Sequence, residues 1–180
     1  MSGDDKLLQS PLALSFRSAT AGDVESVVRI LNEAADFLDA VGPEPLWARD
    51  TIDRAAVSAV VDEFVVARDD AGGADVGVFR FQRSDDLFWS DVADPPGTVS
   101  AFVHKVAVVR SVAGRGVSDA LLRHAKALAA AAGCTLLRLD CAFEQRDKLV
   151  AFYVRNGFVP HSIKAIPFYP WRVQRFELKL

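Results

Sequence analysis

Two glycines at the junction between an expected strand and an expected helix are the residues most suggestive of chemistry. The stretch reads VVRSVAGRGVSDALL from Val108 to Leu122, with Gly114 and Gly116 on either side of Arg115. The first turn of a helix presents unpaired N–H groups and a partial positive charge, which favour a bound anion. Glycines leave room for its close approach. The stretch predicts a phosphate-binding loop, although an ordinary tight strand-to-helix turn has the same composition.

Two common phosphate motifs fit this loop poorly. A nucleotide P-loop requires Gly-Lys-Ser/Thr, and the loop has no such lysine. A dinucleotide fingerprint, Gly-x-Gly-x-x-Gly, would have Asp119 in place of its third glycine, which normally permits close helix–strand packing. Asp140, at the end of the next expected strand, can mimic the ribose-binding acid of that fingerprint. An NAD(P)-dependent oxidoreductase therefore stays open as an alternative.

Two motifs together resemble the GNAT superfamily of N-acetyltransferases, over about residues 14–180. The family signature, Gln/Arg-x-x-Gly-x-Gly/Ala, aligns with Ala113–Ser118, where Gly116 matches the central glycine, and the preceding strand aligns with His104–Val108. A second family motif is present as FYVRNGF, residues 152–158. The resemblance implies an acetyl-CoA-dependent N-acetyltransferase that acts on a primary amine by direct attack. A non-catalytic acyl-CoA-binding module of the same fold is the first alternative.

The resemblance also implies which residues bind acetyl-CoA, the acyl-donor cosubstrate. Ala113 stands where the family has Gln or Arg, and Arg146 lies near a position that is usually Asn. Asp119 is a specific risk: facing the phosphates it would weaken binding, whereas facing Arg123 it would not. The expected cofactor-binding residues are Val106, Val108, Ala113, Gly114, Arg115, Gly116, Val117, Ser118 and Arg146.

Two residues are expected to act on protons. Tyr153 matches the general acid of the family, and an ordinary tyrosine pKa of about 10 keeps it able to donate to a thiolate at neutral pH. His104 lies where many relatives carry glutamate, and an ordinary histidine pKa of about 6.5 would suit a general base. The alternatives are a core aromatic for Tyr153 and a buried, hydrogen-bonded strand histidine for His104.

The acceptor site is expected, from the resemblance, at two proline-containing segments, Val41–Trp47 and Ala165–Trp171. Trp47, Tyr169 and Trp171 are the candidate acceptor-binding residues, because aromatic rings hold cations or stack on flat groups. The same residues also suit simple packing under a loop. The acceptor is expected to be a small-molecule or peptide amine.

The order of elements predicts an α/β fold with a mixed sheet of about six to seven strands and helices on both faces. The family resemblance adds a splayed parallel pair of strands. Antiparallel strands are expected in the first half and a right-handed strand–helix–strand unit around the glycine loop. Expected strands cover residues 14–17, 64–67, 76–81, 99–109, 135–139, 158–159 and 173–178, and expected helices cover 24–40, 51–61, 117–132 and 146–156.

Bulk composition narrows the function further. The chain has 180 residues, which predicts one domain, 14–180, after a loose leader, 1–13. A net charge of −3 disfavours nucleic acid as the main partner. Only 2 Cys and 3 His, with no Cys-x-x-Cys pair, predict no metal site and a reducing compartment. We expect a cytoplasmic protein that does not contact membranes, with a homodimer as an open possibility.

Overall fold

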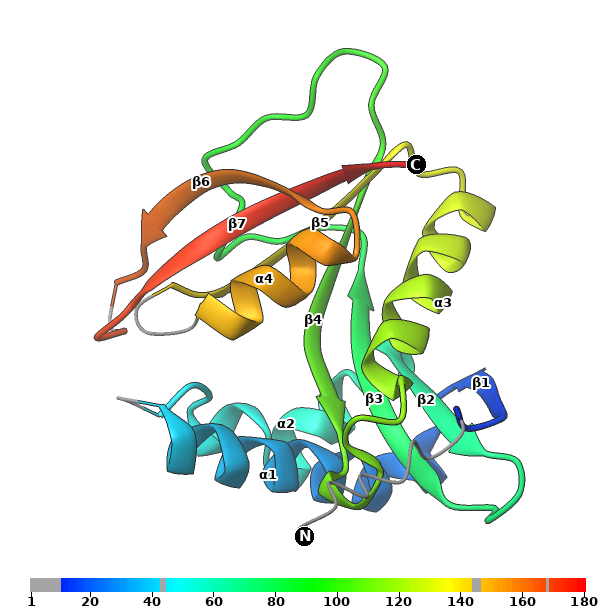
Figure 1. Cartoon of the computed structure of the whole chain (residues 1–180). Coiled ribbons are helices and arrows are strands. Elements are labelled where there is room, and N and C mark those ends of the chain that lie inside the picture. Colours follow the sequence, from blue (N-terminus) through cyan, green and yellow to red (C-terminus); the bar gives the residue numbers. More distant parts are fainter. Residues whose placement is uncertain (1–10, 43–44, 144–146, 168) are drawn as a thin grey trace, which may run out of the picture.

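In a computed structural model, seven strands form one mixed sheet in the order β1-β2-β3-β4-β5-β7-β6 (Figure 1). The structure describes residues 11–42, 45–143, 147–167 and 169–180. The predicted mixed sheet with a parallel pair is confirmed. The strands are β1 (Leu14–Ser18), β2 (Phe64–Asp69), β3 (Asp75–Gln82), β4 (Ser100–Val108), β5 (Leu136–Ala142), β6 (Val159–Ala165) and β7 (Arg172–Lys179).

The described residues form four α-helices around the sheet: α1 (Val24–Val41), α2 (Arg54–Ala59), α3 (Val117–Ala131) and α4 (Asp147–Arg155). The second helix is shorter than predicted, because 3-10 turns at Arg49–Thr51 and Val61–Glu63 occupy its flanks. No helix in the described ranges is both long and apolar enough to cross a lipid bilayer.

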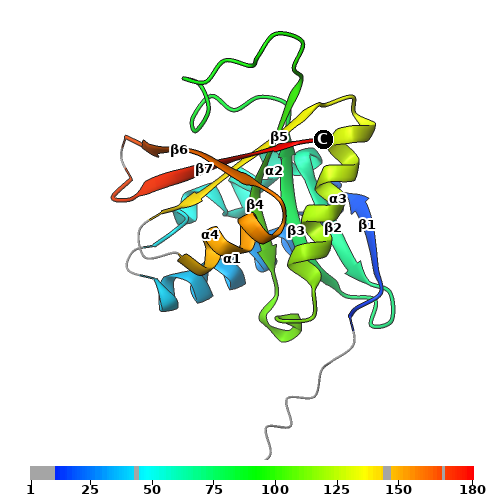
Figure 2. The same cartoon turned by 45° about the horizontal axis from the view of Figure 1, so that its top comes forward.

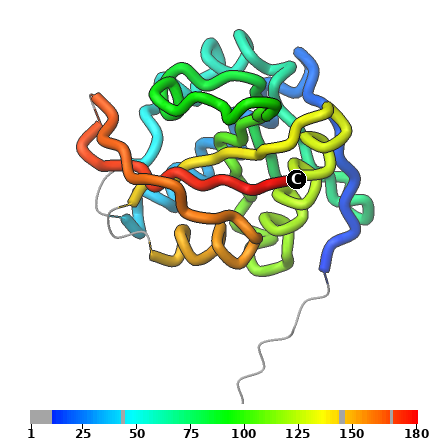
Figure 3. Tube along the Cα trace, turned by 90° about the horizontal axis from the view of Figure 1, so that it is seen from above, coloured from blue at the N-terminus to red at the C-terminus, as the bar shows by residue number. Residues whose placement is uncertain are grey.

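Helices pack on both faces of the sheet, as predicted (Figure 3). On one face α1 buries a stripe that includes Val27, Ile30 and Leu31 against β3 and β4. On the other face α3 approaches β3 so closely that a Cβ on Gly77 would lie 3.1 Å from Leu121 Cδ1. Gly77 therefore sets the distance at which α3 can pack.

The parallel pair β4–β5 is joined only at its start. Ser100 to Val103 pair with Leu136 to Leu139, and beyond this point β4 continues along β3 while β5 continues along β7. The two strands therefore diverge from His104 and Asp140 onward, as the predicted splay requires. Figure 1 shows β4 descending away from β5 below this point.

A bulge in β4 marks the divergence. Val78 pairs with Ala107 and Arg80 with His104, so two β4 residues, Lys105 and Val106, lie opposite the single residue Phe79. Lys105 has φ +54°, and within the described ranges no other non-glycine residue has positive φ. Because a bulge interrupts the alternation of side chains, consecutive residues here can face the same side.

The long connection between β3 and β4, residues 83–99, runs as an irregular loop beside the sheet (Figure 1, Figure 2). A buried tryptophan fastens this loop to the sheet. Trp89 is 2% exposed and lies against Arg138 and Arg175, whose guanidinium carbons are 4.7 and 5.2 Å from its ring centroid. Arg138 Nη1 also lies 2.6 Å from Asp94 Oδ1, and Arg175 Nη1 lies 2.8 Å from Asp91 Oδ1. These contacts give an otherwise irregular segment a fixed place beside β4 and β5.

Strand β6 is longer than the sequence predicted. Residues 158–159 were expected as the whole strand, whereas β6 runs from Val159 to Ala165 along β7. It is an edge strand, and most of its residues are exposed, so it lacks the apolar pattern that marks a buried strand. The first ten residues of the predicted leader lie outside the described ranges, and the 1–13 boundary stays a prediction.

Candidate active site

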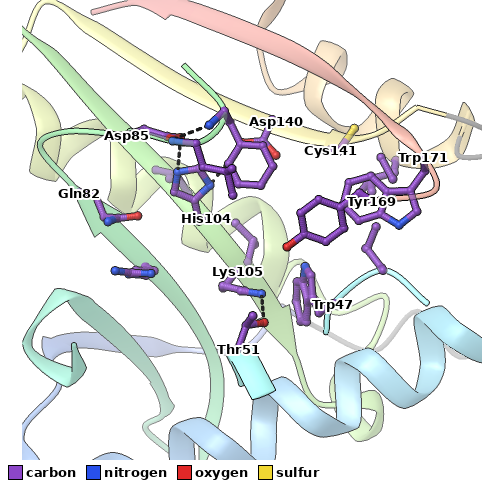
Figure 4. Close-up of a pocket in the computed structure, with 18 of the residues that line it drawn as sticks. Trp47, Thr51, Gln82, Asp85, His104, Lys105, Asp140, Cys141, Tyr169 and Trp171 are labelled. Atoms are coloured by element: carbon purple, nitrogen blue, oxygen red, sulfur yellow. Dashed lines mark hydrogen bonds and ion pairs between the residues drawn. The ribbon is translucent and has the colours of Figure 1, made fainter. Parts of the chain in front are cut away.

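A pocket of about 480 Å³ opens where β4 and β5 diverge (Figure 4). Its walls come from the end of α1, the loop before α2, strands β3, β4 and β5, the 83–99 loop, helix α4 and the segment before β7. This volume lies within the range of small-molecule sites. The pocket contains both predicted catalytic residues, His104 and Tyr153, and all three predicted acceptor residues, Trp47, Tyr169 and Trp171.

His104 lies between two carboxylates at the point of divergence. Its Nε2 is 2.9 Å from Asp85 Oδ2, and its Nδ1 is 3.3 Å from Asp140 Oδ1. Asp85 comes from the 83–99 loop, where its Oδ1 accepts from the backbone N–H groups of Leu87 and Phe88. Asp140 comes from β5, directly after the last residue that pairs with β4. We call Asp85, His104 and Asp140 the acidic triad.

The acidic triad holds its histidine in the charged form. Burial lowers the pKa of His104, but hydrogen bonds to Asp140 and Asp85 outweigh burial and raise that pKa to about 9. With both ring nitrogens protonated, the triad carries two negative charges and one positive charge. An imidazolium has no free lone pair with which to accept a proton, so this arrangement favours a positioning role for His104, and the general-base role stays a prediction.

The same three side chains are the one group in the described ranges whose ligand atoms lie close enough together, within 4.8 Å, to hold a metal ion. Each ring nitrogen of His104, however, already faces one carboxylate oxygen. A histidine binds a metal through one nitrogen only, so an ion would replace one of these two contacts. The geometry is that of an imidazolium ion-paired with two carboxylates.

Lys105, which the sequence analysis did not single out, also reaches into the pocket. Its Nζ donates to Thr51 Oγ1 at 3.1 Å and lies 4.8 Å from the centroid of the Trp47 ring. Burial, with nearby Arg80, lowers the pKa of Lys105 to about 8. In Figure 4, Lys105 points toward Thr51 and Trp47, and His104 points the opposite way toward Asp85.

Tyr153 lies at the far wall of the pocket, on α4. The side chain is buried among the aromatic rings of Phe152, Phe158 and Phe176. Burial, with Cys141 and Asp140 nearby, raises the pKa of Tyr153 above its ordinary value. Tyr153 therefore keeps its proton throughout the neutral range, as a donor to a leaving group must.

Aromatic side chains form the outer wall. Tyr169 and Trp171 stack with ring centroids 4.5 Å apart, and Trp171 Nε1 donates to the backbone oxygen of Pro45 at 3.1 Å. This bond ties the segment before β7 to the loop before α2, so the two segments predicted to form the acceptor site do meet. Phe168 lies outside the described residues.

A second pocket lies at the glycine loop. It is lined by Val108, Ala113, Gly114, Gly116, Val117 and Ser118 from the predicted set, whereas Arg115 does not line it. Gly114 and Gly116 have φ +82° and +78°, and a Cβ on either would meet nothing within 4 Å. Glycine is needed here for its backbone conformation, and the space in front of α3 is open. Arg146 lies outside the described residues.

Asp119 lines the second pocket, and its carboxylate contacts residues other than the expected Arg123. Its Oδ1 accepts from Asn156 Nδ2 at 2.8 Å and lies 3.4 Å from Arg155 Nη2, so the expected partner Arg123 is wrong. Asn156 and Arg155 belong to the FYVRNGF motif, and the carboxylate therefore links the two motifs that carried the resemblance. Asp119 accepts from these residues, and its carboxylate still belongs to the lining of the pocket at the glycine loop.

Positive charge reaches the second pocket from two arginines that line it. Arg110 follows β4, with its guanidinium carbon 3.6 Å from the centroid of the Phe37 ring. Arg155 ends α4, with 64% of its side chain exposed. Sequence reasoning missed Arg155, because its position beside the loop depends on how α4 packs against α3. A basic residue directly before Asn-Gly-Phe was the available signal.

Sequence reasoning also missed two members of the main pocket. Asp85 lies in an irregular loop that no periodicity marks. Lys105 reads as one polar residue in an apolar strand. The sequence suggested Asp140 only as a possible ribose-binding acid. In the structure its carboxylate contacts His104 in the main pocket. These residues come together in one pocket only because β4 is bulged and the 83–99 loop is held beside the sheet.

Comparison with known proteins agrees with this geometry. A family model described as an acetyltransferase (GNAT) domain matches residues 61–160. No curated protein sequence matches the chain. An acetyltransferase of the GNAT family from Listeria monocytogenes 4b F2365 is 22% identical, with a TM-score of 0.73 over 94% of this chain and 96% of that one.

Two further solved structures of this fold contain the cofactor. PaiA N-acetyltransferase from Thermoplasma acidophilum, in complex with coenzyme A, is 14% identical, with a TM-score of 0.71 over 94% of this chain and all (100%) of that one. YncA from Salmonella typhimurium, with its cofactor acetyl-CoA, is 16% identical, with a TM-score of 0.67 over 93% and 94% of the two chains. The matched family model spans more than half of the sequence, and it includes the glycine loop and the strands that diverge. The chain therefore belongs to the GNAT family of acetyltransferases.

Proposed function

We propose that this protein transfers the acetyl group of acetyl-CoA to a primary amine by direct attack of the amine on the thioester. The observation that carries the proposal is the continuity of the two pockets along β4. Val106 lines the pocket at the divergence, and Val108, two residues later, lines the pocket at the glycine loop. One extended ligand can therefore reach both pockets along this strand.

The residues present suit the two ends of such a ligand. The N-terminus of α3, with open space before Gly114 and Gly116 and with Arg110 and Arg155 alongside, suits a pyrophosphate. Beyond Val103, β4 has no partner strand on the side of β5, so backbone groups near Val106 and Val108 can pair with an extended pantetheine arm. The acetyl group would then lie near Tyr153.

The reaction joins the amine nitrogen to the thioester carbonyl carbon and breaks the carbon–sulfur bond. The thiolate that leaves needs a proton, and the Tyr153 hydroxyl is the donor that we assign to it. The acceptor enters as an ammonium ion and must lose one proton before it attacks. Overall, an ammonium ion and acetyl-CoA yield an amide, free coenzyme A thiol and one proton.

We assign His104 a positioning role in place of the base role. As an imidazolium it fixes the carboxylates of Asp85 and Asp140, and the excess negative charge of the acidic triad favours an ammonium group in the pocket. The neutral amine in equilibrium with that ammonium ion is the attacking species. We expect kcat/KM to rise with pH until the acceptor amine is largely deprotonated.

Thiol release tests the proposal directly. The purified chain, incubated with acetyl-CoA and a panel of primary amines, should release free coenzyme A in an amine-dependent manner, with the acetylated amine seen by mass spectrometry. Calorimetry should show binding of acetyl-CoA and none of NAD(P)H. Tight binding of acetyl-CoA without release for any amine would favour the non-catalytic acyl-CoA-binding module.

Replacing His104 should make stability depend less on pH. The pKa of His104 lies above that of an unfolded histidine, so its stabilisation is full below about pH 6.5 and is lost as the pH rises through about 9. For His104→Gln, the deficit in the free energy of unfolding should shrink by about 3 kcal/mol between pH 6 and pH 10. Urea unfolding at both pH values measures it.

The matched control for this measurement is His161→Gln. His161 is an exposed histidine whose Nδ1 lies 2.7 Å from Ser162 Oγ. The same urea unfolding at pH 6 and pH 10 is measured for both variants, so the change specific to His104 is the difference between them. If His104→Gln loses the same free energy of unfolding, relative to the parent, at both pH values, that result would contradict the charged state assigned to His104.

Removing Arg155 should weaken acetyl-CoA binding. Arg155→Gln takes away one charge at the glycine-loop pocket and one contact of Asp119, so the dissociation constant should rise about 3- to 10-fold. Arg123→Gln is the matched control, because Arg123 is exposed on α3 and does not line that pocket. Calorimetry at two salt concentrations should show that the dissociation constant of acetyl-CoA depends more strongly on salt in the parent than in Arg155→Gln. Equal effects of the two substitutions would refute the placement of Arg155.

A further inference from the structure

Regions of opposite charge lie at two ends of the main pocket, and two consecutive residues of β4 lead to them. His104 and Lys105 both line this pocket, although successive side chains of a regular strand point to opposite faces. The bulge at Lys105, with φ +54°, accounts for this arrangement. Figure 4 shows the two side chains diverging, His104 toward Asp85 and Lys105 toward Thr51 and Trp47.

The lysine end of the pocket favours an anion. Among the ion pairs of the described residues, no carboxylate lies within 4.0 Å of Lys105 Nζ, whose hydrogen-bond partner is the neutral hydroxyl of Thr51. Arg80 lines the same side of the pocket, with its Nε 2.6 Å from Glu63 Oε2. The carboxylates of Asp140 and Asp50 act on this ammonium only from beyond ion-pair distance, and burial with Arg80 outweighs them. A mostly buried ammonium without a paired carboxylate carries a desolvation cost that an anionic ligand would offset.

The opposite end favours a cation. The acidic triad holds two carboxylates and one imidazolium, and the side chains of Asp85 and Asp140 are 4% and 9% exposed. Within this buried cluster one negative charge is left over. Trp47, Tyr169 and Trp171 form an aromatic wall of the same pocket.

We propose that the acceptor is a small zwitterion, a primary amine that carries a carboxylate or phosphate group, with its amine toward the acidic triad and its anionic group on Lys105. This inference rests on the proposed function and names the substrate class for it. A carboxylate and a phosphate would each form an ion pair with the Lys105 ammonium. Either group leaves the amine of the acceptor free to attack the thioester. An amine without an anionic group leaves the lysine unpaired and binds more weakly.

Matched acceptor triplets test the proposal with the full-length protein and acetyl-CoA. Each triplet contains an amino acid, its amide and its decarboxylated amine, and the set covers aromatic, aliphatic and acidic side chains. Phosphoethanolamine against ethanolamine forms the phosphate arm. For at least one triplet, or for the phosphate arm, kcat/KM for the member that carries the anionic group should exceed that for the partners that lack it about 10- to 100-fold.

Substitution of Lys105 assigns the preference to this residue. Lys105→Met should raise KM for the zwitterionic acceptor about 10-fold or more. It should leave KM for the matched amine that lacks an anionic group, and the dissociation constant of acetyl-CoA, within about 3-fold. Lys105→Arg should restore most of the preference. The matched control is Lys179→Met, an exposed lysine at the end of β7 that lies outside the pocket lining.

Several outcomes would overturn the proposal. One is a wild-type protein that uses the decarboxylated amines as well as the anionic acceptors in every set. Another is a Lys105→Met protein whose kcat falls equally for acceptors with and without an anionic group, which would make Lys105 part of the chemistry. Failure of the proposed function looks different, because acetyl-CoA would then bind without thiol release for any amine.

Discussion

Tyr153→Phe should lower kcat about 100-fold while it leaves the dissociation constant of acetyl-CoA within about 2-fold of the parent value. The substitution removes only the hydroxyl, and the ring remains among Phe152, Phe158 and Phe176. Because burial keeps the Tyr153 hydroxyl protonated, the parent can supply a proton to the departing thiolate at any neutral pH. In the variant, only water can supply a proton to that thiolate. Steady-state kinetics and calorimetry measure the two quantities.

The chain offers a matched substitution, because Tyr169 is its other tyrosine. Tyr169 lies in the same pocket, stacked on Trp171, so Tyr169→Phe removes a hydroxyl at the aromatic wall. We expect its effect on kcat to be much smaller than that of Tyr153→Phe. Loss of acetyl-CoA binding with normal turnover in Tyr153→Phe, or equal losses of kcat in both variants, would remove Tyr153 from the acid role.

Gly116→Glu should abolish measurable acetyl-CoA binding, with a rise in the dissociation constant of at least about 100-fold. The side chain would enter the open space in front of α3, where the pyrophosphate is proposed to lie, and its carboxylate would repel that group. The φ of +78° adds a backbone strain of about 1–2 kcal/mol for any residue with a Cβ. Calorimetry measures binding, and thermal unfolding measures the strain.

Gly133→Glu separates the strain from the loss of binding. Gly133 has φ +73°, also with nothing within 4 Å of its Cβ position, but it follows the other end of α3. The two variants should lose similar stability, and only Gly116→Glu should lose the cofactor. If both bind acetyl-CoA like the parent, the pyrophosphate does not lie at the glycine loop.

Local sequence patterns were sufficient for most of the architecture. The apolar stripe of α1, the hairpin β2–β3 and the unit of β4, α3 and β5 follow from periodicity and from turn residues such as Gly73, with φ +66°. The glycine loop was likewise predictable, because Gly114 and Gly116 adopt the positive φ that their residue type permits. Strand β6 escaped prediction because an exposed edge strand has no buried face to mark it.

The sequence by itself determined the loop and the presence of Tyr153 and His104, because these features depend on residue type and short spacing. Only the tertiary structure decided what they touch. Asp119 meets Asn156, 37 positions away, and His104 meets Asp85 and Asp140. The bulge at Lys105 brings a cation to the pocket that alternation would have put on the opposite face. The physical reason is that protonation state and charge pairing depend on distances between segments remote in sequence, which no local pattern encodes.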